Sequence, residues 1–277
     1  MPITRTPYKS ATRPLETIVA DLIGPVSAVF NGTRQPSPSI GGNRYILVIM
    51  DEFTRHAWIH LLQKKSDAAG EVYNLLALLK RQYGQFPIHR FHTDGGTEFV
   101  NRFIGDYLVQ EGIKHTTTTR DKPSHNGKAE RFNQTLINII RSMLNGSNAH
   151  LSLWGDAAIQ ACYVYNRTPL KVIDNSTPYE LLNGRAPDLS KIKVFGSNVY
   201  YSINESERSK IQPTSNKGAW IGFDERKNGH RILIDSDGHV IVSRDVKHIE
   251  SKFSHLAEIM GAQPEPNRQY RFVICCN

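Results

Sequence analysis

Three acidic residues stand where they could act together on a phosphate ester. Asp21 lies near the end of an apolar, β-branched stretch, Asp94 follows a second such stretch, and Glu130 comes after Asp94 with 35 residues between them. A charged group in an apolar strand is costly unless it is paired or bound to a metal. Clustered carboxylates repel one another and favour a hard divalent cation such as Mg²⁺. Two such ions activate a nucleophile and stabilise the leaving oxygen in phosphodiester chemistry.

Each acid also has an ordinary structural explanation when it is taken alone. Asp94 precedes two glycines, a setting in which aspartate often forms a turn. Glu130 falls in the first turn of an expected helix, where the helix dipole favours an acid. Asp21 is harder to explain in this way because Leu22 and Ile23 follow it before any turn. The combination of the three acids indicates a metal site much more specifically than any one of them does.

The hydrophobic pattern predicts the elements that would bring these acids together. Strands are expected at 15–23, 44–50, 55–62, 88–93 and 113–119, and helices at 66–83, from 97 onward, at 128–144 and at 152–166. The second and third strands should form a hairpin. If the first and fourth strands are adjacent and parallel, Asp21 and Asp94 lie side by side. The helical crossover indicates an α/β fold with a mixed sheet covered by helices.

Some local details are also predicted. Ser66 is expected to cap the first helix. The second helix should begin at Thr97 and turn four side chains inward: Phe99, Phe103, Tyr107 and Leu108. Residues 31–43, rich in Gly, Pro, Ser and Asn, are expected to form a loop. Asp51 and Glu52 also follow an apolar strand, but they should lie at the hairpin tip, away from the acids.

The order of these patterns predicts the domain organisation. Residues 1–14 form an extended lead-in, 15–185 an α/β core, 190–250 a small all-β module, and 253–277 a tail without a strong pattern. The all-β module is rich in Lys and Arg, so it would add phosphate contacts that do not depend on sequence. An interaction or packing module explains the same composition equally well.

The composition excludes several classes of protein. Among the 277 residues, 34 Lys and Arg stand against 26 Asp and Glu, a formal charge of +8 that makes a polyanionic partner plausible. The apolar runs are too short for a membrane span, and the N-terminus lacks the apolar segment of a signal peptide. Three cysteines form neither a disulfide framework nor a zinc half-site.

Six motifs together resemble the integrase of copia-type LTR retrotransposons, within the retroviral integrase superfamily. They occur in order and span roughly residues 15–250. They read ETIVADLIGP, RYILVIMDEFTRHAWIHLL, FHTDGGTEF, KPSHNGKAERFNQTLINIIRSML, KIKVFGSNVYY, and the pair KGAWIGF with VIVSRDV.

The resemblance implies an RNase H-like core with a D…D-x(35)-E site. By position, Asp21, Asp94 and Glu130 match its catalytic, metal-binding acids, which would hold Mg²⁺ or Mn²⁺ as a pair of ions. The family processes the 3′ ends of element DNA and joins them to target DNA. Double-stranded DNA is the implied partner, with no small-molecule substrate and no membrane. A homo-oligomer is implied, acting in the nucleus after a cytoplasmic virus-like particle.

The segment around Glu130 supplies the expected DNA contacts. The resemblance points to five residues that could contact phosphates: His125, Asn126, Lys128, Arg131 and Asn133. Asn126 could equally be a helix N-cap, and the charged members could form an ordinary solvated helix face.

The sequence departs from the family pattern in one respect, so two other interpretations of its function stay open. The family places a His/Cys zinc module upstream of the core, and no Cys precedes Cys162. We therefore expect either an excised piece or the product of a truncated element. A catalytically inactive DNA-binding remnant and a simple RNase H-like nuclease are the alternatives. The complete acid triad argues against the first, and the 35-residue spacing with the copia-type β motifs argues against the second.

Overall fold

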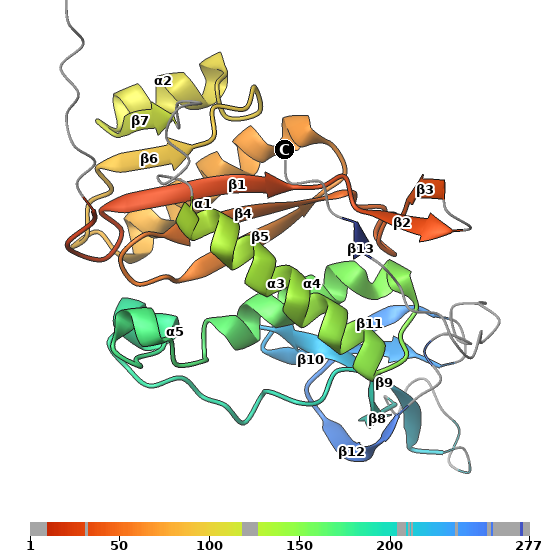
Figure 1. Cartoon of the computed structure of the whole chain (residues 1–277). Coiled ribbons are helices and arrows are strands. Elements are labelled where there is room, and N and C mark those ends of the chain that lie inside the picture. Colours follow the sequence, from red (N-terminus) through yellow and green to blue (C-terminus); the bar gives the residue numbers. More distant parts are fainter. Residues whose placement is uncertain are drawn as a thin grey trace, which may run out of the picture.

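A mixed sheet of five strands carries two of the three acids at one edge. The computed structural model describes residues 10–30, 33–117, 127–203, 209, 211, 213–235, 238–253, 256 and 272–273. The strands follow the order β5-β4-β1-β6-β7, in which β1 is antiparallel to β4 and parallel to β6 (Figure 1). Their bounds are β1 (Thr17–Ile23), β4 (Tyr45–Asp51), β5 (Ala57–Leu62), β6 (Arg90–Thr93) and β7 (Lys114–Thr117).

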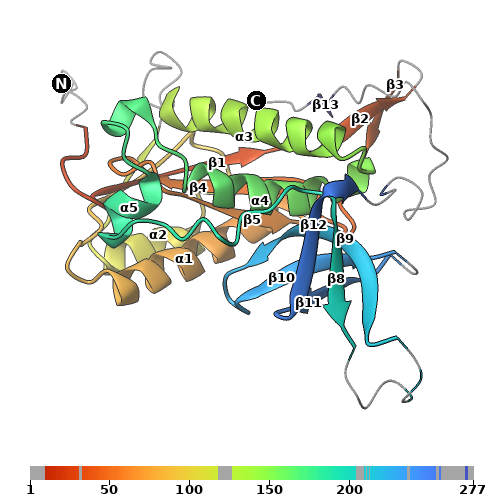
Figure 2. The same ribbon diagram turned by 90° about the horizontal axis from the view of Figure 1, so that it is seen from below.

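Helices cover both faces of this sheet. Strand side chains alternate between faces, so that Ile18 and Ala20 of β1 pack with α1 (Ala68–Gln82) and α2 (Arg102–Gln110). Ile23 packs on the other face with α3 (Gly127–Gly146) and α4 (Trp154–Tyr165), and Figure 2 shows the sheet between the two layers. Short helical segments complete the layers: the 3₁₀ turns Lys65–Asp67, Leu151–Leu153 and Lys171–Ile173, and α5 (Pro178–Asn183).

A second sheet follows α5 and is antiparallel throughout. Its strand order is β11-β10-β9-β8-β12. Its strands are β8 (Ser197–Ser202), β9 (Ser215–Asp224), β10 (Gly229–Ile234), β11 (Val240–Ser243) and β12 (Val246–Phe253). In Figure 2 this sheet lies against the end of the α3–α4 layer. Ala219, Ile221 and Leu233 belong to the same hydrophobic cluster as Trp154 of α4, so one core runs through both parts.

The fold class predicted from the sequence is confirmed: an RNase H-like α/β core with a five-stranded mixed sheet, followed by a small all-β module. The strands and the hairpin of β4 and β5 agree with the hydrophobic pattern. The strand β12 and the helix α5 were not predicted. None of the helices in the described ranges is long and apolar enough to cross a membrane.

The expectation of a loop at residues 31–43 was wrong in part. β2 (Ser27–Phe30) pairs antiparallel with β3 (Thr33–Pro36), and β13 (Phe272–Val273) pairs with β2 from within the segment predicted to be a tail without pattern. The composition of residues 31–43 hid the strand, although Asn31-Gly32 is a strong hairpin signal.

Two helix starts also differ from the prediction. The second helix begins at Arg102 rather than Thr97, because Asn101 caps it: its Oδ1 accepts a hydrogen bond from the Ile104 amide at 3.1 Å. The buried residues of this helix are Ile104 and Leu108, and the prediction that Phe103 turns inward was wrong, because it is 57% exposed. Ser66 does not cap the first helix either, since α1 begins at Ala68 after a 3₁₀ turn.

Candidate active site

The pairing of β1 with β6 aligns the first two acids. The strands run parallel with Thr17 opposite Arg90 and Val19 opposite His92. The same register, extended by two residues, sets Asp21 opposite Asp94, which directly follows β6. The carboxyl ends of two adjacent parallel strands therefore present these side chains at one edge of the sheet.

Helix α3 lies over β1 and brings Asn133 to Asp21. The Asn133 side-chain amide, which is 3% exposed, donates to Asp21 Oδ2 at 2.7 Å. The Leu22 amide donates to Asp21 Oδ1 at 2.8 Å. Each carboxylate oxygen is thus held by one donor, which fixes the orientation of the group. Glu130 lies one turn before Asn133, on the exposed side of the helix.

The surroundings of Asp21 shift the pKa of its carboxyl strongly. Burial is the largest cause that raises the pKa of its carboxyl to about 6, and the hydrogen bond from Leu22 acts against it. The negative charges of Asp94 and Glu130 raise the same pKa further. Both acids therefore lie close enough to Asp21 to repel its charge.

The donor set fits a divalent cation, although the acids do not converge on one point. Asp94 and Glu130 are exposed, and Asp94 Oδ1 accepts from the Gly96 amide at 2.9 Å. Within the described residues, no three His, Cys, Asp or Glu side chains are close enough to hold an ion. Repulsion among hard carboxylates is what a bound cation relieves. Asn133 Oδ1, buried without a hydrogen-bond partner, is a further oxygen beside Asp21.

The expected DNA contacts divide into three groups. His125 and Asn126 lie outside the described residues. Arg131 is exposed on the first turns of α3 and remains a predicted contact. Asn133 is buried against Asp21 and the Lys128 ammonium pairs with Glu52, so both have partners within the protein, and their DNA contacts stay predictions.

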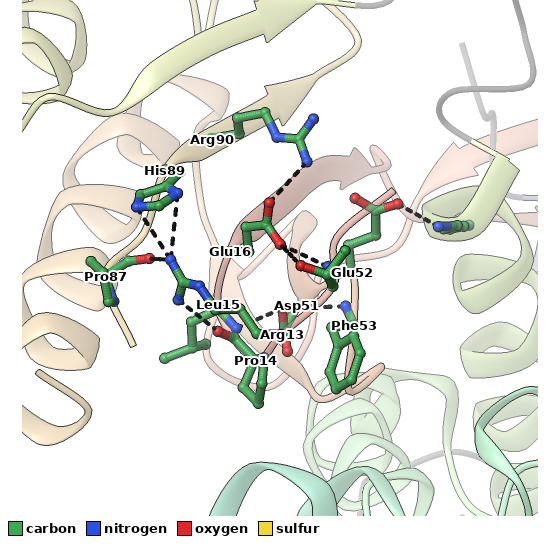
Figure 3. A network of polar contacts seen from close by, with 12 residues as sticks. Arg13, Pro14, Leu15, Glu16, Asp51, Glu52, Phe53, Pro87, His89 and Arg90 are labelled. Carbon is green, nitrogen blue, oxygen red and sulfur yellow. Dashed lines mark hydrogen bonds and ion pairs between the residues drawn. The ribbon is translucent and has the colours of Figure 1, made fainter. Parts of the chain in front are cut away.

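The hairpin acids Asp51 and Glu52 have separate surroundings. Asp51 pairs with Ile18 at the opposite end of β1 from Asp21, and it closes the turn after β4. Its carboxylate accepts from the Leu15 amide at 3.1 Å (Figure 3). It also accepts from the Thr54 hydroxyl at 2.7 Å. Asp51 is therefore a structural residue. The sequence did not indicate a role for Glu52, because its partner Lys128 lies 76 positions away.

Comparison with known families agrees with this geometry. Residues 11–123 match the integrase core domain, and residues 197–259 match the retroviral polymerase SH3-like domain. Residues 11–123 thus form an integrase core domain, and a retroviral SH3-like domain follows it. The integrase core match covers β1, β4, β5, β6 and β7 with Asp21 and Asp94, and the SH3-like match covers β8 to β12.

The relatives of this integrase core are retrotransposon polyproteins, which confirms the copia-type resemblance. The chain is 30% identical over 245 residues to the Retrovirus-related Pol polyprotein from transposon TNT 1-94 of Nicotiana tabacum, covering 88% of this chain and 18% of the relative. The transposon RE2 polyprotein of Arabidopsis thaliana is 28% identical over 253 residues, with 90% and 16% covered. The chain thus spans less than a fifth of the length of these relatives.

Solved structures with a similar integrase core are more distant. A simian T-cell lymphotropic virus intasome in complex with PP2A regulatory subunit B56 gamma has a TM-score of 0.48 at 16% identity, with 87% of this chain and 80% of that chain covered. The HTLV-2 integrase catalytic core domain in complex with magnesium has a TM-score of 0.45 at 16% identity, with 62% and 99% covered.

Proposed function

We propose that this chain is a retrotransposon integrase, a polynucleotidyl transferase that processes the 3′ ends of element DNA and joins them to target DNA. The observation that carries the proposal is the register that sets Asp21 opposite Asp94, with the charges of Asp94 and Glu130 both acting on Asp21, in a chain that matches the integrase core domain. No Ser, Cys or Tyr nucleophile is needed, because the attacking oxygen comes from water or from a DNA 3′-hydroxyl.

Asp21, Asp94 and Glu130 would hold Mg²⁺ or Mn²⁺. A bound pair of such ions supplies activation of the attacking oxygen and stabilisation of the leaving oxygen. Asp21 contributes a carboxylate whose orientation Leu22 and Asn133 fix before any ion binds. Asp94 and Glu130 are exposed, and their side chains would turn toward Asp21 as the site fills, with Asp94 giving up the bond from the Gly96 amide.

The proposed partners follow from this reaction. The chain would bind double-stranded DNA at both the element end and the target, with Arg131 and the basic all-β module contacting phosphates. Joining two element ends requires two active sites, which favours a homo-oligomer. Such an enzyme acts on chromosomal DNA, so we place its action in the nucleus, after assembly in a cytoplasmic virus-like particle.

A branched DNA oligonucleotide that mimics the integration product tests this proposal. The protein is incubated with the branched DNA and Mn²⁺, beside an Asp94→Asn variant, and resealed strands are measured on a denaturing gel. Resealed DNA with the unmodified protein alone is the expected result. Cut but never joined DNA would favour an RNase H-like nuclease. DNA binding without any product from either protein would favour an inactive remnant.

A further inference from the structure

Glu52 is a buried acid that the proposed chemistry does not use. It lies in the turn after β4, is 1% exposed, and its amide donates to the Thr17 carbonyl at 2.9 Å. Figure 3 shows Glu52 and Asp51 pointing to different sides of this turn. The Glu52 Oε1 atom pairs with the ammonium of Lys128, in the first turn of α3. Because a buried carboxylate is costly without a partner, this pair ties α3 to the hairpin.

Lys128 and Glu130 stand on opposite flanks of the buried face of α3. Successive residues of an α-helix are rotated by about 100°, so residues two positions apart differ by about 200°. Ala129, between them, is buried, as are Phe132 and Asn133 further along the same face. The buried stripe therefore runs between Lys128 on one flank and Glu130 on the other.

The strand order places these flanks over different parts of the sheet. β1 lies between β4, which leads to Glu52, and β6, which leads to Asp94. The bond from Asn133 to Asp21 sets α3 over β1. An anchor on the β4 side therefore limits how far α3 turns about its own axis, and with it the side to which Glu130 points.

We propose that Glu52 is a positioning residue for the acid site: through its buried ion pair with Lys128 it sets the rotation of the first turn of α3, so that Glu130 faces the side of Asp94. This inference rests on the proposed function. It also gives Lys128 a role other than phosphate contact. A misplacement of about 1 Å at a catalytic group costs on the order of 100-fold in rate, so a loosened first turn should reduce catalysis strongly.

The test uses Glu52→Gln, Lys128→Met and the double variant, with Asp156→Asn as a matched control. Asp156 of α4 pairs with Arg231 of β10 at 2.5 Å, and the side chains of that pair are 10% and 24% exposed, against 0% and 23% for Glu52 and Lys128. Glu52→Gln and Asp156→Asn thus each remove one charge from an ion pair of similar exposure. Only the pair of Glu52 and Lys128 includes a residue of α3.

The first readout is hydrogen exchange of the amides of residues 131–134, which bond to the carbonyls of the first turn. The second is Mn²⁺ affinity, and the third is resealing of the branched DNA. We expect both single variants to exchange at least about tenfold faster at these amides and to bind Mn²⁺ more weakly. Resealing should fall at least about tenfold, in kcat rather than KM. The double variant should lose no more than either single one, since both remove the same contact.

Several results would overturn the proposal. Wild-type exchange and Mn²⁺ affinity in Glu52→Gln would do so, and so would an equal change in Asp156→Asn. If Glu52→Gln does not fold, the Glu52→Met, Lys128→Met variant leaves no unpaired charge, and wild-type exchange and affinity in that protein would refute the role. If the unmodified protein joins no DNA, the proposed function fails, while exchange still decides the role of Glu52.

Discussion

At the scale of single residues, Asp21 shows how a carboxylate is kept oriented among other acids. Its two oxygens accept one bond each, from the Leu22 amide and from Asn133. Leu22 is a backbone donor that any residue would supply, whereas the Asn133 donor depends on one side chain. Groups that orient a metal-binding residue in this way contribute strongly to metal affinity. Asn133 is therefore the residue by which this support can be removed.

Substitution of Asn133 by Ala should lower Mn²⁺ affinity by about 10–100-fold, because Asp21 loses the donor that orients it. Calorimetric titration with Mn²⁺ measures the affinity directly. Asn138→Ala is the control, since Asn138 is exposed on the same helix and accepts from Gln134 at 3.1 Å. An equal loss in both variants would mean that the effect comes from helix stability and not from Asp21.

The sequence was sufficient to align the acids but not to identify their supports. Asp21 and Asp94 end apolar strands whose pattern is local, and parallel pairing then brings them together. Asn133 and Glu52 act through partners 112 and 76 positions away. Those contacts depend on how α3 is rotated over the sheet, and periodicity specifies only which face of a helix is buried. A polar residue on that face was the available signal for Asn133.

At the scale of elements, the all-β module contains a buried histidine that must be neutral. His230 of β10 is 8% exposed, and its Nδ1 accepts a hydrogen bond from Trp220 Nε1 at 3.0 Å. Burial is the main cause that lowers its pKa to about 4, and His248, Lys191 and Lys193 lower it further by their charge. A proton on Nδ1 would abolish the bond from Trp220.

The module should consequently lose stability in acid. The unfolded chain binds a proton at His230 near its ordinary pKa of about 6.5, while the folded protein resists until about pH 4. Stability is therefore fully present above pH 6.5 and falls as the pH drops toward 4, by on the order of 3 kcal/mol from this residue. Urea unfolding at pH 7.5 and 4.5 measures the loss.

His230→Gln isolates this contribution, because Gln offers Trp220 an acceptor and has no proton to gain. We expect the variant to lose less stability than the unmodified protein between the two pH values. Equal losses would assign the acid sensitivity to other histidines, such as His56, whose pKa is lowered to about 3 by loss of solvation.

The elements missed from the sequence share a cause. β3 contains Pro36, and β12 has exposed polar residues at several positions, so neither shows a clean alternation. Both are strands because a neighbouring strand pairs with them: β2 with β3, and β8 with β12. Pairing supplied by tertiary context overrides weak local propensity.

At the scale of the whole molecule, the core and the all-β module are packed as one unit. Leu233 of β10 is fully buried in the cluster that contains Trp154 and Ala158 of α4. Gln160 of α4 accepts from the Phe223 amide at 3.3 Å. The junction thus has the apolar core and polar bonds of an intramolecular interior, and the two parts should unfold together.

Leu233→Ala should destabilise the entire chain by about 2–5 kcal/mol through the cavity it leaves. Calorimetry should show a single unfolding transition at lower temperature. A second, unshifted transition would show instead that the α/β core unfolds independently of the module. Val172→Ala, at a position 72% exposed in the same chain, is the control and should leave the transition unchanged.

Because the module is fixed to the core, its charges act at a set distance from the acids. An open groove of about 730 Å³ crosses β8, β9 and β12, and it is lined by exposed Arg244, Lys247 and Tyr200, with Asp245 as the acid among them. If DNA follows this groove, each cation neutralises one phosphate and releases one counterion. Arg244→Ala with Lys247→Ala should then lower the slope of log affinity against log salt by about 2.

The control is Lys80→Ala with Arg81→Ala on α1, which removes the same charge from the opposite face of the core sheet. An equal change of slope in both variants would show that DNA responds to net charge alone, whereas a change confined to the groove variant would make the module a second DNA contact held in register with Asp21 and Asp94.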